Sequence, residues 1–172
     1  VGPAAFEWLS RGLVEACLGF IEGTGAGQGL RVAAYEFHYQ PILDALHDAM
    51  VRGVDVQIIY DAKKESPGDR NHAAVLAAGL DGVSTARTTH PSYIQHNKFA
   101  VIDGQIVWTG STNLTYTGFT LNANNSIVIT DTALAGVYTT EFEEMWAGSF
   151  HRNKADNTPH LLAYDGTGLE SY

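Results

Sequence analysis

The segment QHNKFAVIDGQIVWTGSTN, residues 95–113, carries the clearest structural signal in the chain. Polar and apolar side chains alternate along it, break at Asp103–Gly104, and then alternate again, which is typical of two strands joined by a tight turn. The segment therefore predicts a β-hairpin over about residues 97–109. The buried face of a hairpin needs only apolar side chains, yet polar ones gather where its two strands end: His96, Lys98, Ser111 and Asn113. These residues are the first candidates for a functional site.

A strand–helix–strand pattern precedes the hairpin. Residues 30–37 and 54–61 are rich in β-branched and other apolar side chains and predict two buried strands. Between them, Pro41 at the start and Gly53 at the end predict a helix over residues 41–53. Two strands joined by a helix normally lie parallel, with a right-handed crossover. The chain is therefore predicted to be an α/β protein with a mixed, largely parallel β-sheet sandwiched between helices.

The remaining elements fit the same plan. Apolar spacing predicts one helix over residues 3–22, and the glycine-rich residues 23–29 are interpreted as a connector, because a phosphate-binding loop follows a strand. The other expected elements are a helix at 71–78, a short strand at 82–86, a strand at 126–130 and a closing helix at 133–146. Residues from 151 onward are polar and rich in turn formers. We therefore expect residues 1–150 to form one lobe and residues 151–172 to be a linker or the start of a second lobe.

The composition narrows the functional classes. The chain has 172 residues, of which 45% are hydrophobic, and this suits one domain with a sizeable core. No apolar run reaches the ~18 residues that a membrane span needs, and no signal peptide is visible. Cys17 is the only cysteine, which excludes an internal disulfide and a cysteine-based metal site. The net charge of −9 argues against a broad basic surface for nucleic acid, although a narrow cationic cleft is compatible with it.

The end of the hairpin has the composition of an anion site. His96 and Lys98 are two residues apart and therefore lie on the same face of a strand. An imidazole and an ammonium side by side are unfavourable when both are charged, unless they face a common anion. The Ser111 hydroxyl and the Asn113 amide return to the same place, and Gly110 allows close backbone approach. The other histidines lack the spacing of zinc ligands, so no metal site is expected.

These residues also form a family motif. The pattern H-x-K-x4-D at His96, Lys98 and Asp103, followed by GSTN at residues 110–113, resembles the signature of the phospholipase D superfamily. The similarity extends over about residues 30–147, through AYEF, VRGVDVQIIYD and NANNSIVI. In these segments the chain resembles the small bacterial endonucleases of that superfamily.

The resemblance implies a phospholipase D-like lobe that acts as a metal-independent phosphodiesterase with no cofactor. In that family the histidine of one motif attacks phosphorus to form a phosphohistidine, and the histidine of a second motif protonates the leaving oxygen. The same resemblance makes His96 one of these two histidines. It also implies that Lys98 and Asn113 hold the phosphoryl oxygens and that Ser111 forms hydrogen bonds within the site. Asp103 belongs to the motif but is expected to order structure more than to perform chemistry.

The sequence departs from the family pattern in two ways. It contains one H-x-K-x4-D motif where the reaction needs two, so the second motif must come from an identical chain or from a missing second half. In addition, Asn124 stands where the endonucleases place a glutamate that accepts a hydrogen bond from a catalytic histidine. An amide oxygen can accept this bond but carries no charge. Asn124 would therefore stabilise an imidazolium less well than a glutamate.

Substrate contacts are also expected outside the motif. His38 lies just past the end of a predicted strand, and a basic cluster lies in the loop after the second strand, where a cleft would open. The candidates for substrate binding are Asn124, His38, Lys63, Lys64 and Arg70.

The sequence leaves three functions open and does not indicate a compartment. Hydrolysis of nucleic-acid phosphodiester bonds is the first, and phospholipase D or transphosphatidylase chemistry on phospholipids is the second. The third is a non-catalytic lobe that serves for pairing. Lipid chemistry needs an apolar surface that can meet a bilayer, and the loop around Tyr116, Phe119 and Leu121 is the candidate for it.

Overall fold

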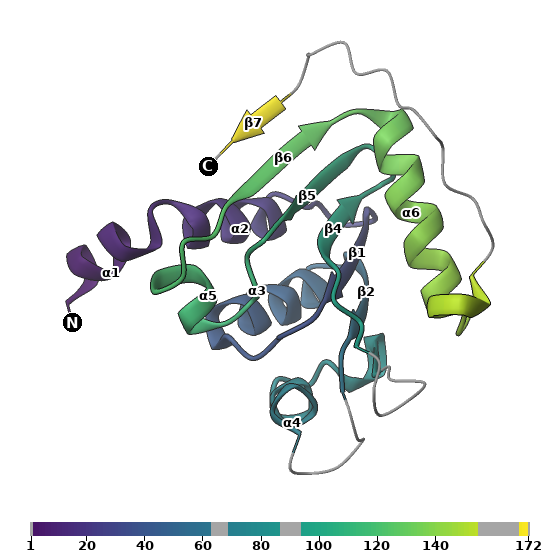
Figure 1. Ribbon diagram of the computed structural model, residues 1–172, viewed down its shortest axis with the longest axis horizontal. Coiled ribbons are helices and arrows are strands. Elements are labelled where there is room, and N and C mark those ends of the chain that lie inside the picture. The colour runs from purple at the N-terminus through teal and green to yellow at the C-terminus, as the bar shows by residue number, and fades with distance from the viewer. Residues whose placement is uncertain (1, 63–68, 87–93, 155–168, 172) are drawn as a thin grey trace.

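A central β-sheet runs through the molecule, and helices lie on both of its faces (Figure 1). The computed structural model describes residues 2–62, 69–86, 94–154 and 169–171. Within these residues the sheet has seven strands in the order β3–β2–β1–β4–β5–β6–β7. The strands are β1 (Gly29–Ala34), β2 (Asp55–Tyr60), β3 (Ser84–Ala86), β4 (Lys98–Ile102), β5 (Ile106–Gly110), β6 (Ser126–Thr130) and β7 (Leu169–Ser171). The helices are α1 (Pro3–Ser10), α2 (Leu13–Glu22), α3 (Gln40–Val51), α4 (Arg70–Ala77), α5 (Tyr116–Thr120) and α6 (Thr132–Trp146), with 3-10 turns at Asp81–Val83 and His151–Asn153.

The sheet is mixed, but it is not largely parallel. Strand β1 runs parallel to β2, and β2 runs parallel to β3, as the strand–helix–strand pattern predicts. The pairs β1–β4, β4–β5, β5–β6 and β6–β7 are antiparallel, so the prediction of a largely parallel sheet is wrong. The physical reason is the short connection within the hairpin, because only antiparallel strands can be joined by a tight turn. Strand β4 then pairs with β1 in the antiparallel sense and sets the direction of the strands beyond it.

The hairpin turn has the geometry that its two residues favour. Asp103 has a φ angle of 49° and Gly104 one of 62°, so both lie in the left-handed region. The turn closes with a hydrogen bond of 2.9 Å from the Gln105 N–H to the Ile102 carbonyl. Asp-Gly is a favoured pair for such turns, because their backbone twist matches that of the flanking strands. The hairpin predicted from the sequence is therefore confirmed.

Side chains that alternate along the strands divide between two apolar layers. Helices α2 and α3 cover one face of the sheet, where Leu43 and Leu46 pack with Ile58 in one buried cluster. Helix α6 covers the other face, where Phe142 packs with Ile59 and other alternate strand residues. Figure 1 shows α6 separated from α2 and α3 by the strands. The predicted sandwich of a sheet between helices is therefore confirmed.

The predicted helix over residues 3–22 is in fact two helices. Arg11 has a φ angle of 53° and Gly12 one of 85°, and this left-handed pair ends α1 before α2 begins. The break lets α1 leave the sheet and turn towards α5 (Figure 1). There the Arg11 guanidinium donates a hydrogen bond of 2.6 Å to the Asn122 carbonyl. The apolar spacing continues across the break, and for this reason the sequence alone suggested one helix.

Candidate active site

The candidate site lies at the edge of the sheet where β1 and β5 end and β4 begins. Lys98, the first residue of β4, pairs with Ala34, the last residue of β1. Gly110, the last residue of β5, pairs with Ser126 at the start of β6. Loops that leave this edge carry polar side chains from segments far apart in the sequence. The sheet register therefore gathers these side chains in one place.

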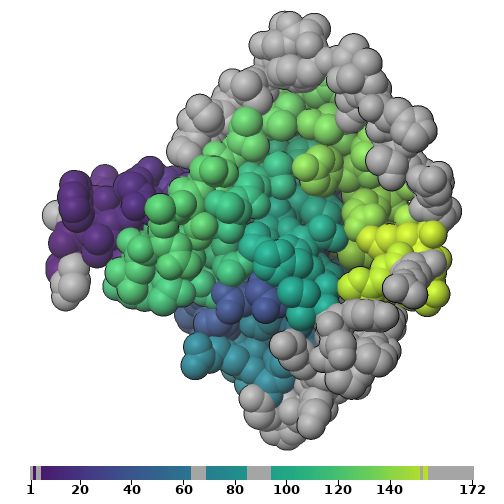
Figure 2. Space-filling view, viewed as in Figure 1, coloured from purple at the N-terminus to yellow at the C-terminus, as the bar shows by residue number. Residues whose placement is uncertain are grey.

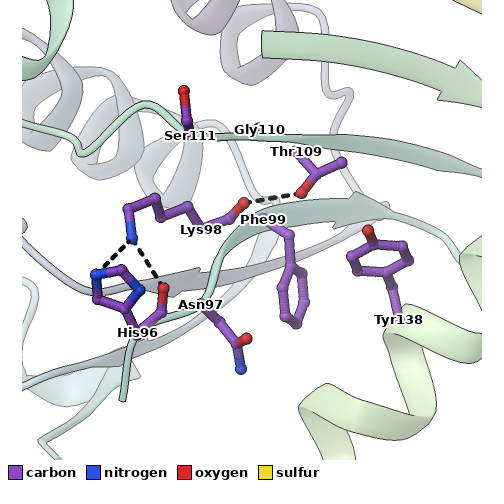
Figure 3. A pocket seen from close by; sticks show the side chains of 8 residues that line it. All are labelled: His96, Asn97, Lys98, Phe99, Thr109, Gly110, Ser111 and Tyr138. Atoms are coloured by element: carbon purple, nitrogen blue, oxygen red, sulfur yellow. Dashed lines mark hydrogen bonds between the residues drawn. The ribbon is translucent and has the colours of Figure 1, made fainter. Parts of the chain in front are cut away.

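His96 and Lys98 face each other at this edge (Figure 3). The Lys98 Nζ lies 3.4 Å from His96 Nε2 and donates a hydrogen bond of 2.9 Å to the His96 carbonyl oxygen. The Tyr35 ring packs beside both, with its centroid 4.5 Å from that of the His96 ring and 5.1 Å from Lys98 Nζ. In Figure 3, Asn97 and Phe99 point to the opposite side of the strand. The prediction that His96 and Lys98 share a face is therefore confirmed.

A pocket of about 400 Å³ opens over this pair. Ser111 closes the pocket on the β5 side, and Tyr138 of α6 lies at its other wall (Figure 3). His96 is exposed, whereas Lys98 is half-buried and lines the pocket. A cation and two polar side chains at the wall of an open pocket can hold a small anion.

The charge of Lys98 is set by two opposing effects. Burial lowers the pKa of its ammonium from the ordinary value of 10.5. The Glu36 carboxylate nearby raises the pKa and opposes part of this effect. A lowered pKa means that the ammonium loses its proton at a lower pH than an exposed lysine does. Any reaction that needs the Lys98 charge is therefore expected to decline earlier on the alkaline side.

Ser111 and Asn124 form a hydrogen-bonded pair next to this pocket. The Ser111 hydroxyl donates to Asn124 Oδ1 over 3.1 Å and accepts a hydrogen bond of 3.0 Å from the Asn125 N–H. The Asn124 Nδ2 in turn donates to the Gly118 carbonyl over 2.8 Å. Both ends of the Asn124 amide are thus occupied within the protein. The structure brings Asn124 to the site but gives it contacts that hold Ser111.

Asn113 reaches the site from the loop before α5. Its Nδ2 donates a hydrogen bond of 2.6 Å to Glu36 Oε2, while its Oδ1 is buried without a partner among the described residues. Glu36 follows β1, so this bond joins the end of β1 to the loop after β5. Glu36 is not among the site residues predicted from the sequence. Its place in the AYEF segment next to the predicted strand end was the signal that could have found it.

Gly110 is required where β5 meets β6. A Cβ atom at this position would lie only 2.3 Å from the Asn125 carbonyl oxygen. This separation is far shorter than a van der Waals contact, so a side chain here would push the two strands apart. The close backbone approach predicted for Gly110 is confirmed.

Asp103 lies at the opposite end of the hairpin from the pocket. Five residues of extended chain separate it from Lys98, which corresponds to about 16 Å. Its carboxylate accepts a hydrogen bond of 2.6 Å from the Gly29 N–H and one of 2.7 Å from Gln28 Nε2. Asp103 thus fastens the hairpin turn to the chain that enters β1.

Replacing Asp103 with alanine is expected to destabilise the protein without changing the chemistry. The substitution leaves the Gly29 N–H without its charged acceptor, and we expect the free energy of unfolding to fall by about 1–3 kcal/mol. Urea denaturation followed by circular dichroism measures this change. Below the unfolding transition, turnover per folded molecule should stay within about twofold of the wild type. A twofold change corresponds to ~0.4 kcal/mol in the activation free energy. A large loss of turnover by a fully folded variant would contradict this assignment.

The remaining predicted contacts lie around a second cavity. His38 and Arg70 line a space of about 280 Å³ together with Glu36, and none of these three residues lines the pocket over His96 and Lys98. The His38 Nδ1 lies 3.3 Å from Asn71 Oδ1. Lys63 and Lys64 lie outside the described residues. Two of the candidate substrate contacts, His38 and Arg70, therefore lie together at a cavity of their own.

Asn71 is a further residue that the sequence analysis did not single out. Its Nδ2 donates to the carbonyls of Tyr35 and Asp61, both over 2.8 Å, and its Oδ1 accepts a hydrogen bond of 2.8 Å from the Phe37 N–H. One amide thus links the segments that follow β1 and β2 to helix α4. No local sequence pattern marks this role, because all its partners are distant in the chain.

Two other findings concern the part of the chain that the structure describes. It contains no cluster of three or more histidine, cysteine, aspartate or glutamate side chains that could hold a metal ion. None of its helices has the length and apolar character required to cross a bilayer.

Comparison with known proteins identifies the family. The family model described as "Cardiolipin synthase, PLD-like domain" matches residues 24–146, which is more than half of the chain. Together with the sheet, the H-x-K-x4-D motif and the His96–Lys98 pocket, this match shows that the chain belongs to the phospholipase D superfamily of phosphodiesterases.

Curated relatives carry names of the same superfamily. The chain is 31% identical over 122 residues to the mitochondrial cardiolipin hydrolase of Xenopus laevis, covering 71% of this chain and 56% of that protein. It is 36% identical over 117 residues to a phospholipase D of Rickettsia bellii, covering 66% of this chain and 54% of that one. The chain thus spans about half the length of the curated relatives it matches.

Solved structures share the fold. Nuc from Salmonella typhimurium, a phospholipase D family member, superposes with a TM-score of 0.66 and 28% identity, covering 78% of this chain and 86% of that one. NucT from Helicobacter pylori superposes with a TM-score of 0.64 and 24% identity, covering 81% and 91%, and supports the fold. The prediction of a phospholipase D-like lobe is confirmed.

Proposed function

We propose that this protein hydrolyses phosphodiester bonds through a covalent intermediate on histidine, without a metal ion. The observation that carries the proposal is the separation of 3.4 Å between His96 Nε2 and Lys98 Nζ at the wall of an open pocket. A phosphoryl oxygen bound to the ammonium would bring its phosphorus close to the imidazole. Neutral imidazole is a competent nucleophile near neutral pH, and a fixed ammonium stabilises charge that develops on the phosphoryl oxygens.

The reaction has two steps in this proposal. In the first, the lone pair of an imidazole nitrogen forms a phosphorus–nitrogen bond, the bond to the leaving oxygen breaks, and a second imidazole gives that oxygen a proton. In the second, a water molecule transfers a proton to the second imidazole while its oxygen attacks phosphorus, and the phosphorus–nitrogen bond breaks. Ser111 forms hydrogen bonds within the site, while Lys98 holds the phosphoryl oxygens throughout. Asn113 is a further candidate for this role, since its amide is anchored by Glu36.

The second imidazole must come from another lobe. We propose that residues 1–150 form one lobe and that its counterpart is either a second copy of this chain or a second half joined through residues 151–172. With two identical lobes, the interface would be isologous, and the two His96 side chains would face each other across it. Sedimentation velocity at increasing protein concentration distinguishes these cases, because only a self-associating chain gives a dimer that dissociates on dilution.

Nucleic acid is the first candidate substrate. The pocket is open and polar. A second cavity carries His38 and Arg70, which suit contacts to a phosphate backbone, and three carboxylates line it as well. Incubation with an end-labelled single-stranded oligonucleotide and, separately, with phosphatidylcholine vesicles, both in EDTA, tests the substrate class. Oligonucleotide cleavage that survives chelation supports the proposal. Cleavage that stops in EDTA and returns with added metal overturns the metal-independent mechanism.

A phospholipid is the second candidate, because one specific surface favours it. Helices α1 and α5 lie side by side, and their exposed apolar residues are Trp8, with 78% of its surface exposed, Tyr116 with 45%, and Leu121, just after α5, with 62%. Figure 2 shows α1 projecting from the body next to the α5 region. Phe119, which the sequence analysis grouped with this surface, is fully buried instead. Tryptophan and tyrosine at the rim of an apolar patch suit the boundary of a bilayer.

Replacing Leu121 with serine is expected to weaken binding to neutral phosphatidylcholine vesicles about tenfold. Insertion of an exposed leucine into lipid contributes roughly 1.5–3 kcal/mol, and 1.4 kcal/mol corresponds to a tenfold change in affinity. Cosedimentation with vesicles measures the partition coefficient. The matched control is Leu76→Ser on α4, because Leu76 is also exposed but lies outside the α1–α5 surface. Equal binding by both variants and the wild type would remove the reason for a lipid substrate.

A further inference from the structure

Glu36 occupies a central position in the candidate site. The backbone beyond β1 continues beside the segment after β5, since the Glu36 carbonyl accepts a hydrogen bond of 3.0 Å from the Leu114 N–H and Phe37 forms a parallel bridge with Leu114. This pairing brings the Glu36 carboxylate to Asn113, and its charge also acts on Lys98. It also places the carboxylate at the wall of the cavity that His38 and Arg70 line.

The carboxylate of Glu36 acts on both neighbours. It accepts a hydrogen bond of 2.6 Å from Asn113 Nδ2, a short distance for a neutral donor. Through space it also favours the protonated form of Lys98 and so raises the pKa that burial lowers. The first interaction fixes which way the Asn113 amide points, and the second opposes part of the loss of charge that burial favours.

Asn124 cannot supply this negative charge. Its Nδ2 is bound to the Gly118 carbonyl over 2.8 Å and its Oδ1 to the Ser111 hydroxyl over 3.1 Å. A carboxylate at position 124 would lose the first bond and place its oxygen against a carbonyl oxygen. Position 124 therefore requires a side chain that both donates and accepts a hydrogen bond, as an amide does.

We propose that Glu36 is a positioning residue of the phosphoryl site, which orients the Asn113 amide and provides beside Lys98 the carboxylate charge that Asn124 lacks. This inference rests on the proposed phosphodiesterase function. The other titratable groups that face Lys98 are His96 on its own segment and Tyr35 after β1. Tyr138 on α6 lines the same pocket but packs against Phe99 on the other side of β4. Glu36 is the carboxylate whose charge acts on the Lys98 ammonium.

Two substitutions separate the two roles of Glu36. Glu36→Gln keeps an oxygen that can accept the Asn113 hydrogen bond but removes the charge. Glu36→Asp keeps the charge but is one methylene too short to reach the same amide. The matched control is Glu143→Gln on the exposed side of α6, which removes one negative charge away from the site. Thermal unfolding of each variant checks that it is folded before it is assayed.

The first measurement is the pKa of Lys98 and does not depend on activity. An NMR titration of the lysine ε-methylene signals, with the Lys98 signal assigned from Lys98→Met, should show a lower pKa in Glu36→Gln. The pKa should stay close to the wild-type value in Glu36→Asp and Glu143→Gln. An unchanged pKa in Glu36→Gln overturns the inference whether or not the protein is an enzyme.

The second measurement is the pH profile of kcat/KM for bis(p-nitrophenyl) phosphate. In Glu36→Gln the alkaline limb should move to lower pH, with the loss growing to about tenfold for each unit of displacement. In Glu36→Asp the profile should keep its shape and fall at every pH, because the Asn113 amide is no longer held. A uniform loss without displacement in Glu36→Gln would indicate a merely structural role and overturn the inference. If the wild type itself is inactive, the proposed function fails, and the NMR titration still decides the role of Glu36.

Discussion

Replacing His96 with alanine is expected to lower kcat/KM for bis(p-nitrophenyl) phosphate by about 10³-fold or more, as loss of a nucleophile or its acid partner generally does. His96 Nε2 lies 3.4 Å from Lys98 Nζ, and no other imidazole in the described residues lies beside this ammonium. No other histidine of this lobe can therefore replace it. Removal of an exposed side chain leaves the sheet edge intact, so the protein should stay folded. A steady-state assay across a range of pH measures the effect.

A control variant makes this result specific. His47→Ala removes an exposed imidazole from α3, away from the pocket, and should retain wild-type activity. Trapping the intermediate assigns the role, since a labelled phosphodiester should leave label on the wild type after alkaline quenching and none on His96→Ala. Activity of His96→Ala above about one tenth of the wild type, a deficit of only ~1.4 kcal/mol, would refute the proposed chemistry.

Replacing Lys98 with methionine is expected to lower kcat by about 10²–10³-fold, the effect usually seen when one fixed donor to a developing oxyanion is removed. Methionine keeps an unbranched apolar stem but removes the ammonium, whose Nζ lies 5.1 Å from the centroid of the Tyr35 ring. Because burial lowers the pKa of Lys98, the wild-type rate should already decline below pH 10.5, the ordinary pKa of a lysine. This alkaline decline should be absent from the residual activity of Lys98→Met.

Arginine should not restore the lost activity. The Lys98 ammonium donates to the His96 carbonyl over 2.9 Å and lies 3.4 Å from its ring nitrogen, and a planar guanidinium cannot occupy this small space in the same way. Lys98→Arg should therefore bind inorganic phosphate yet remain at least tenfold below the wild-type kcat, a deficit of ~1.4 kcal/mol. Recovery of full activity in Lys98→Arg would show that only charge matters at this position.

Local patterns predicted the elements well, whereas long-range pairing set the sheet. Alternation and the Asp103–Gly104 turn identified the hairpin, and residues 126–130 form the strand that was expected. The prediction of a largely parallel sheet was wrong, because the direction of the later strands depends on how β4 pairs with β1. The sequence of neither strand alone specifies that pairing. Helix α5 was missed even though Thr115 caps it, because it spans only five residues. Strand β7 was missed for a similar reason, since it spans only three residues.

The candidate site divides in the same way. His96, Lys98 and Gly110 follow from a motif in one continuous segment, so their proximity could be predicted from strand geometry. Glu36 is remote in sequence and meets Asn113 only because β1 and the loop after β5 leave the sheet at the same edge. No local pattern in the sequence predicts this contact between Glu36 and Asn113.

The Asn71 amide gives helix α4 a mechanical role. Its hydrogen bonds to Tyr35, Phe37 and Asp61 clamp the start of α4 to two strand ends, and Tyr35 is the ring on which His96 rests. A displacement of α4 must therefore either break this clamp or carry the tyrosine with it. The position of the imidazole is thus coupled to α4 through Tyr35, and a substitution at position 71 can lower activity without removing any contact to His96.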